Sequence, residues 1–77
     1  MANDRALLLR DVGAAQLLGV HRATLRRLVA QELAPPPCRL GGSIVWRVDE
    51  LRAWVAAGCP PMRRWTWPLP EGRRGRA

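Results

Sequence analysis

The sequence has 77 residues, with 13 Arg, no Lys and six acidic residues, and a net charge of +7 at neutral pH. A chain of this length forms one small domain, and the excess of positive charge favours a phosphate-rich partner. Because no apolar run approaches the ~18 residues of a membrane span and no secretory pattern is present, a cytoplasmic protein without a membrane partner is expected.

Two short helices joined by a turn are predicted over residues 11–18 and 22–31. Apolar residues recur at spacings of three and four on both sides of Gly19, as they do on the buried face of a helix. Gly19 can take the positive φ that ends a helix, and Asp11 suits the N-cap or first turn of the first helix. The apolar residues 7–9 are expected to lay one or two side chains over the core.

His21 stands at the N-cap of the second predicted helix, where Ser, Thr, Asn or Asp would cap best. Thr24, three residues later, does not complete a capping box, so a weak cap is predicted. Two roles for His21 stay open. It either caps the helix or contacts a partner.

A β-hairpin is predicted next, because the β-prone residues 38–40 and 44–48 flank the turn-forming Gly41-Gly42-Ser43. Prolines at positions 35–37 end the preceding helix. Strict alternation along the second run predicts one packed face and one open face. Ile44, Trp46 and Val48 would then point inward, and Val45 and Arg47 outward.

A third helix is predicted from Glu50 to about Ala57, with Asp49 as its N-cap. Trp54 lies on its inward face, and Trp54 and Trp46 are both expected in the core. After residue 58 the composition changes, because residues 59–77 hold five Arg, one Glu and two of the four Trp without an apolar period. The sequence therefore predicts a domain over residues 1–58 and a flexible Pro/Trp/Arg-rich tail over residues 59–77.

Several features together carry a resemblance to a known family. Ala15, Gly19, Leu25 and Leu28 have a characteristic spacing, with LLGV before the turn and TLRRL after it. In RLGGSIVWRVDELRAWV, a Gly-containing hairpin with an aromatic residue on its second strand leads into an acid-Leu-x-x-Trp helix start. Over roughly residues 8–57 the chain resembles the small MerR-type winged helix-turn-helix domains of the bacterial and phage excisionase family.

The resemblance implies a mainly helical fold with a small β-hairpin, in the order helix, helix, hairpin, helix. It also implies sequence-specific binding of double-stranded DNA, with the second helix in the major groove and the hairpin, or wing, along the backbone or minor groove. The implied contacts of the second helix are His21, Arg22, Ala23, Thr24, Arg26 and Arg27. The implied wing contacts are Arg39, Gly41, Gly42, Ser43 and Arg47.

Chemistry supports these assignments. Arg22 and Arg26 lie one helical turn apart and each suits a bidentate contact to guanine, whereas Ala23 suits a thymine methyl group. Arg27 and Thr24 are better placed for phosphate. Three interpretations of the tail stay open. Its arginines bind DNA as an arm, its tryptophans dock on a recombinase or a second subunit, or the tail is an unstructured, solvated segment. The candidate tail contacts are Arg63, Arg64, Trp65, Trp67, Arg73 and Arg74.

The most favoured function is that of an excisionase, which binds and bends DNA, assists an integrase and associates cooperatively with further copies of itself. A small transcriptional regulator of a phage or mobile element is the first alternative, and an adaptor that binds an acidic protein is the second. The sequence holds no catalytic constellation, so neither an enzyme nor a small-molecule substrate or cofactor is predicted. Cys38 and Cys59 with the single His21 cannot supply four zinc ligands, and reduced thiols are expected.

Overall fold

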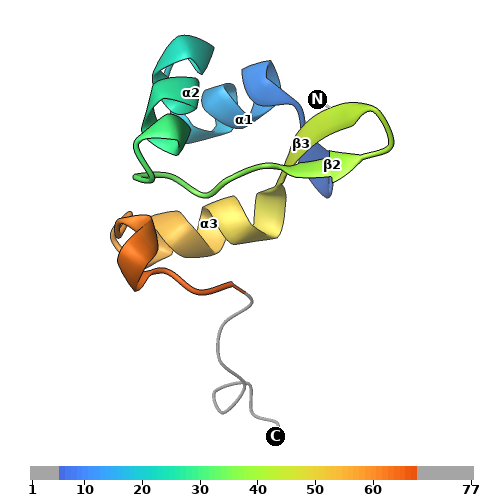
Figure 1. The fold of residues 1–77 in the computed structure, drawn as a ribbon. Helices are drawn as coiled ribbons and strands as arrows, with labels where there is room; N and C mark the ends of the chain where they lie inside the picture. The colour runs from blue at the N-terminus through green and yellow to red at the C-terminus, as the bar shows by residue number, and fades with distance from the viewer. Residues whose placement is uncertain (1–5, 68–77) are drawn as a thin grey trace, which may run out of the picture.

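The computed structural model describes residues 6–67, which form three helices and a small antiparallel sheet (Figure 1). The elements in chain order are β1 (Leu8–Leu9), α1 (Asp11–Leu18), α2 (Arg22–Ala30), β2 (Cys38–Leu40), β3 (Ser43–Arg47), α3 (Val48–Ala56) and the 3₁₀ helix η2 (Met62–Arg64). The mainly helical fold predicted from the sequence, compatible with a winged helix-turn-helix, is confirmed. None of the helices within residues 6–67 has the length and apolar character needed to cross a membrane.

The sheet has three strands in the order β1-β3-β2, one more than the predicted hairpin. Leu8 pairs with Arg47 and Leu9 pairs with Trp46, both antiparallel. A two-stranded hairpin is marginally stable and leaves one edge of each strand unpaired. The short β1 occupies the free edge of β3, so residues 7–9 contribute backbone pairing as well as side chains to the fold.

The predicted alternation along β3 is wrong in part. Ile44 is 42% exposed, whereas Val45 and Trp46 are both buried. Ile44 and Trp46 share a face, but Ile44 lies close to the hairpin turn, and the hairpin projects away from the helices there (Figure 1). Trp46 packs in the buried cluster with residues of all three helices. Its indole N–H donates to the carbonyl of Pro35 at 2.9 Å.

The core lies where the sheet meets all three helices. Leu25 of α2 is fully buried, and Trp46 and Trp54 are 3% and 5% exposed, as predicted. The small side chains of Ala14 and Ala15 let α1 approach its neighbours closely, because helix separation depends on side-chain size at the contact. The buried cluster consists of Leu9, Ala14, Ala15, Leu25, Ala34, Trp46, Val48, Leu51 and Trp54.

The third helix begins earlier than predicted, at Val48, and its N-cap is Arg47 rather than Asp49. β3 runs directly into α3, and the backbone N–H of Val48 donates to the carbonyl of Leu7 at 2.9 Å. A backbone partner from the strand region thus replaces a capping side chain. Asp49 lies in the first turn, where its negative charge is favourable.

Residues 59–67, predicted as the start of a flexible tail, instead pack on the domain. The indole N–H of Trp54 donates to the carbonyl of Pro60 at 2.8 Å, and the backbone N–H of Met62 donates to the carbonyl of Glu32 at 3.0 Å. Met62 and Trp65 contact the buried cluster. Composition missed this packing because the contacts reach several elements and leave no period along the chain. Arg73 and Arg74 lie outside the described residues.

Candidate nucleic-acid interface

The turn between α1 and α2 sets the direction of α2. Gly19 adopts φ 81°, and its N–H donates to the carbonyl of Gln16 at 3.1 Å. The N–H of Val20 donates to the carbonyl of Ala15 at 2.9 Å, which completes a Schellman motif. Val20 also packs against the core. This closed turn holds the two helices in one relative orientation.

One face of α2 is buried and the opposite face is free. Leu25 is completely buried, and Leu28 and Val29 pack against the core. Arg22, Arg26 and Arg27 are exposed, as are His21 and Ala23, whereas Thr24 is half-buried. α2 therefore exposes its first two turns, with three guanidinium groups, to solvent.

His21 caps α2 despite its unfavourable residue type. Its Nδ1 accepts a hydrogen bond from the backbone N–H of Ala23 at 3.1 Å. An accepting Nδ1 carries no proton, so the neutral ring carries its proton on Nε2. The cap occupies one nitrogen and leaves a donor on the other, so the two roles of His21 do not exclude each other.

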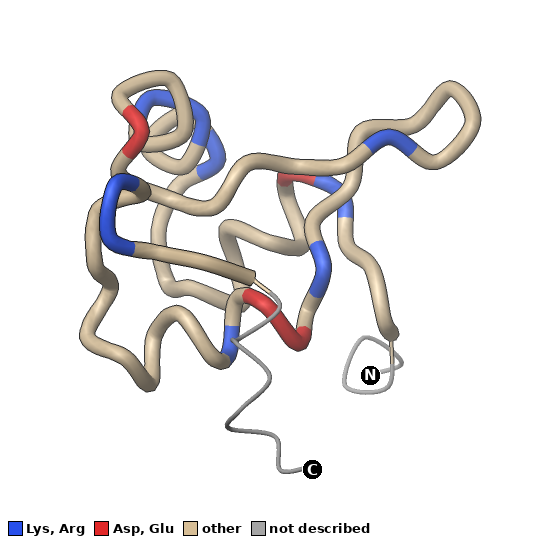
Figure 2. The backbone as a smooth tube through the Cα atoms, turned by 60° about the horizontal axis from the view of Figure 1, so that its bottom comes forward, with Lys and Arg blue, Asp and Glu red and all other residues tan. Residues whose placement is uncertain are grey.

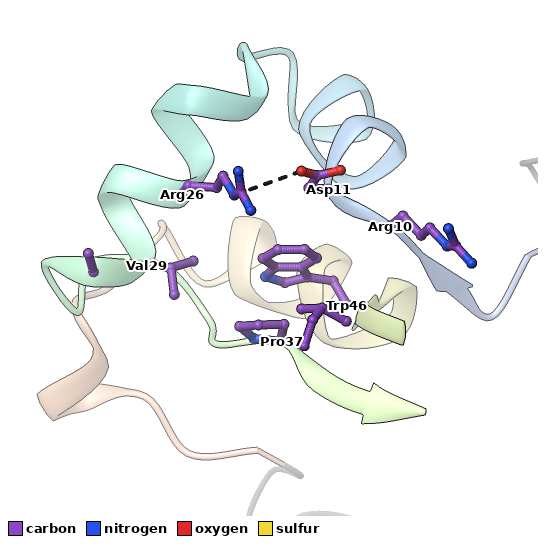
Figure 3. Close-up of a pocket in the computed structure, with 8 residues that line it drawn as sticks. Arg10, Asp11, Arg26, Val29, Pro37 and Trp46 are labelled. Carbon is purple, nitrogen blue, oxygen red and sulfur yellow. Dashed lines mark ion pairs between the residues drawn. The ribbon is translucent and has the colours of Figure 1, made fainter. Parts of the chain in front are cut away.

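Asp11 is a part of this face that sequence reasoning missed. Its Oδ2 lies 3.8 Å from Arg22 Nη1 and 3.8 Å from Arg26 Nε, and Figure 3 shows the pair with Arg26. Its Oδ1 accepts the backbone N–H of Val12 at 2.8 Å. The sequence predicts Asp11 only as an N-cap or first-turn acid of α1, and no local pattern indicates that its side chain approaches α2.

Three arginines lie on or beside the wing, the hairpin formed by β2 and β3. Arg39 on β2 is exposed and forms no ion pair within residues 6–67. Arg10, which sequence reasoning also missed, donates from Nη2 to Ser43 Oγ at 3.1 Å beside the turn formed by Gly41 and Gly42. Arg47 lies at the base of the wing.

Arg47 has a partner inside the protein. Its Nη1 lies 3.6 Å from Glu50 Oε1, and the Glu50 side chain is only 7% exposed. The other carboxylate oxygen of Glu50 accepts the indole N–H of Trp65 at 3.0 Å. Arg47 therefore balances a buried carboxylate, and Arg39 is the better placed wing residue for phosphate.

The segment after α3 adds charge away from the wing. Arg63 and Arg64 are exposed on η2, whereas Trp65 and Trp67 are half-buried with stacked rings 6.2 Å apart. Basic positions thus recur on α2, on the hairpin and after α3 (Figure 2). Trp65 donates to Glu50 inside the domain and Trp67 is stacked on Trp65, so Arg63 and Arg64 are the exposed residues among the candidate tail contacts within residues 6–67.

A cavity of about 400 Å³ separates α2 from the wing. Trp46, Pro37 and Val29 line it, and Arg26 and Arg10 stand on opposite sides with Asp11 between them (Figure 3). Within residues 6–67 no group of His, Cys, Asp or Glu could hold a metal ion. Cys38 and Cys59 are free thiols.

An exposed Arg-rich helix that follows a tight turn, beside a basic hairpin, defines a DNA-binding domain of the helix-turn-helix class. A family model described as a helix-turn-helix domain matches residues 14–59. Because this match spans more than half of the 77 residues, the chain belongs to that helix-turn-helix family. Searches of curated proteins and of solved structures found no match.

Proposed function

We propose that this protein binds double-stranded DNA in a sequence-specific manner, with α2 in the major groove. The observation that carries the proposal is the two-sided character of α2: Leu25 is fully buried, and Arg22 and Arg26 are exposed one turn apart. A major groove admits one α-helix, and side chains near its N-terminus reach the base edges. A guanidinium group at each of two successive turns suits guanine O6 and N7.

The other residues of the face have supporting roles in this proposal. Ala23 contacts a thymine methyl group, and Arg27 and Thr24 bind phosphate. His21 donates from Nε2 to a base or phosphate while Nδ1 keeps its cap. Arg39 and the turn of the wing follow the DNA backbone, and Arg10 joins them through its contact with Ser43.

The first experiment selects binding sites from a random-sequence duplex pool and compares the selected duplex with its scrambled version in a gel shift. Specific binding to DNA is typically about 10³- to 10⁷-fold tighter than non-specific binding. Both weaken as the salt concentration rises, because each phosphate contact releases counterions. A clear preference for the selected duplex at physiological salt is expected. Equal, weak binding to both duplexes would overturn the proposal.

We further propose that the protein is an excisionase that acts with an integrase. The likeness of the α2 and wing sequences to that family supports this role, and so does size, because a domain this small touches few base pairs and gains affinity from neighbouring copies. A recombination reaction with a candidate integrase from the same genome tests it. Excision should rise when the protein is added, and cooperative binding to tandem sites should accompany it; unchanged excision would favour a transcriptional regulator.

A further inference from the structure

We propose that Asp11 is a positioning residue that orients Arg22 and Arg26 for reading bases. This inference deepens the proposed DNA binding and rests on it. One carboxylate oxygen of Asp11 lies 3.8 Å from a nitrogen of each arginine. Asp11 belongs to α1 and the arginines belong to α2, so the contact crosses the helix-turn-helix.

Asp11 is the fixed member of this trio. Its side chain is 24% exposed, against 54% for Arg22 and 66% for Arg26. The backbone N–H of Val12 holds its other oxygen at 2.8 Å. A short, anchored carboxylate between two long side chains restricts the guanidinium groups, each of which would otherwise sample many rotamers.

The geometry leaves donors free for DNA. Arg26 faces Asp11 through Nε, so both of its Nη groups remain available. Arg22 faces Asp11 through Nη1 and keeps Nη2 and Nε. Bidentate recognition of guanine needs two donors held in one plane, and orientation before binding lowers the entropy lost on contact. Asp11 therefore contributes to base discrimination without touching a base.

The charge of Asp11 has a separate effect that does not depend on sequence. Its carboxylate repels the DNA phosphates whatever the bases are, so removal of the charge alone should strengthen binding to every duplex by one common factor. A loss of preference for the correct duplex therefore reports the orientation of the arginines and not the charge.

Asp11→Asn and Asp49→Asn form a matched pair. Each removes one negative charge, and the amide oxygen at position 11 can still accept the N–H of Val12. Asp49 is an exposed first-turn acid of α3 and forms no ion pair within residues 6–67. Affinities are measured for the selected duplex and for single-base variants at its guanine positions.

Asp11→Asn should lower discrimination at these guanines by about three- to tenfold, because an oriented bidentate pair contributes more than a free side chain. Asp49→Asn should leave discrimination unchanged. If both variants shift the affinity for every duplex by one common factor, Asp11 acts only through its charge and the positioning role is overturned. A wild-type protein without discrimination would instead overturn the proposed function, and this role with it.

A double-mutant cycle and a charge-preserving variant complete the test. In an Arg26→Ala background, Asp11→Asn should lose its effect at the base pair that Arg26 reads; an undiminished effect there would overturn the proposal. Asp11→Glu keeps the charge and moves the carboxylate by one methylene, so it should lower discrimination without changing the salt dependence. Unaltered discrimination in Asp11→Glu, with the fold verified by circular dichroism, would also contradict positioning.

Discussion

Trp65→Phe tests whether the segment after α3 is part of the domain. The indole N–H of Trp65 donates to Glu50 Oε2 at 3.0 Å, and Phe keeps an aromatic ring but has no donor. The Glu50 side chain is 7% exposed, so little water can replace the lost partner. After the substitution, Arg47 is the one side chain within residues 6–67 that still pairs with the buried carboxylate of Glu50.

The magnitude follows from these contacts. A hydrogen bond to a charged group contributes about 1.5–3 kcal/mol. Arg47 is half-exposed and still neutralises Glu50 from 3.6 Å, which puts the loss in the free energy of unfolding at the lower end, about 1.5–2 kcal/mol. For a domain of this size each kcal/mol lowers Tm by about 4–8 °C, so a fall of roughly 10 °C is expected.

Thermal melts and urea titrations followed by circular dichroism measure the effect, with Trp67→Phe as the control. Trp67 stacks on Trp65 at 6.2 Å, but within residues 6–67 its indole N–H donates no hydrogen bond. The control should lose less than about 0.5 kcal/mol, because Phe keeps a ring that can stack on Trp65 and the substitution removes no hydrogen bond within residues 6–67. Equal losses in both variants, or no loss in Trp65→Phe, would refute the reasoning from Glu50.

Three further changes test the turn, the cap and the wing. Gly19→Ala should lower the free energy of unfolding by about 1–2 kcal/mol because φ is 81°, whereas Gly42→Ala, at a position without positive φ, should cost less than about 0.5 kcal/mol in the same urea titrations. His21→Ala should cost about 0.5–2 kcal/mol through loss of the cap, and His21→Asn should retain most of the stability; equal losses would show that the cap contributes nothing. Arg39→Ala should weaken binding to selected and scrambled duplexes alike and reduce the salt slope by about one; a loss confined to the selected duplex would contradict a phosphate contact.

Local patterns in the sequence are sufficient to predict the positions of the helix-turn-helix elements. Gly19 and the spacing of apolar residues on each side located α1, the turn and the start of α2, and the glycines at 41 and 42 located the hairpin. These features depend on backbone conformation and on one-sided burial, which neighbouring residues determine. The buried positions of Trp46 and Trp54 followed from the same patterns.

Contacts between distant parts of the chain were not predictable in this way. The pairing of Leu8–Leu9 with β3, the donation from Trp65 to Glu50 and the approach of Asp11 to α2 each join residues that share no period. The early start of α3 has the same origin, because a carbonyl from residue 7 binds the first N–H of the helix. For the candidate site, sequence reasoning found the arginines of α2 but not the acid beside two of them.

The most direct test of DNA reading by α2 is a binding profile of the wild-type protein and Arg26→Ala on every single-base variant of the selected duplex. The profile of Arg26→Ala should lose about 1–3 kcal/mol of discrimination at one base pair and keep it elsewhere. A uniform loss of affinity across all variants, with no base pair singled out, would contradict the assignment of α2 as the reading helix.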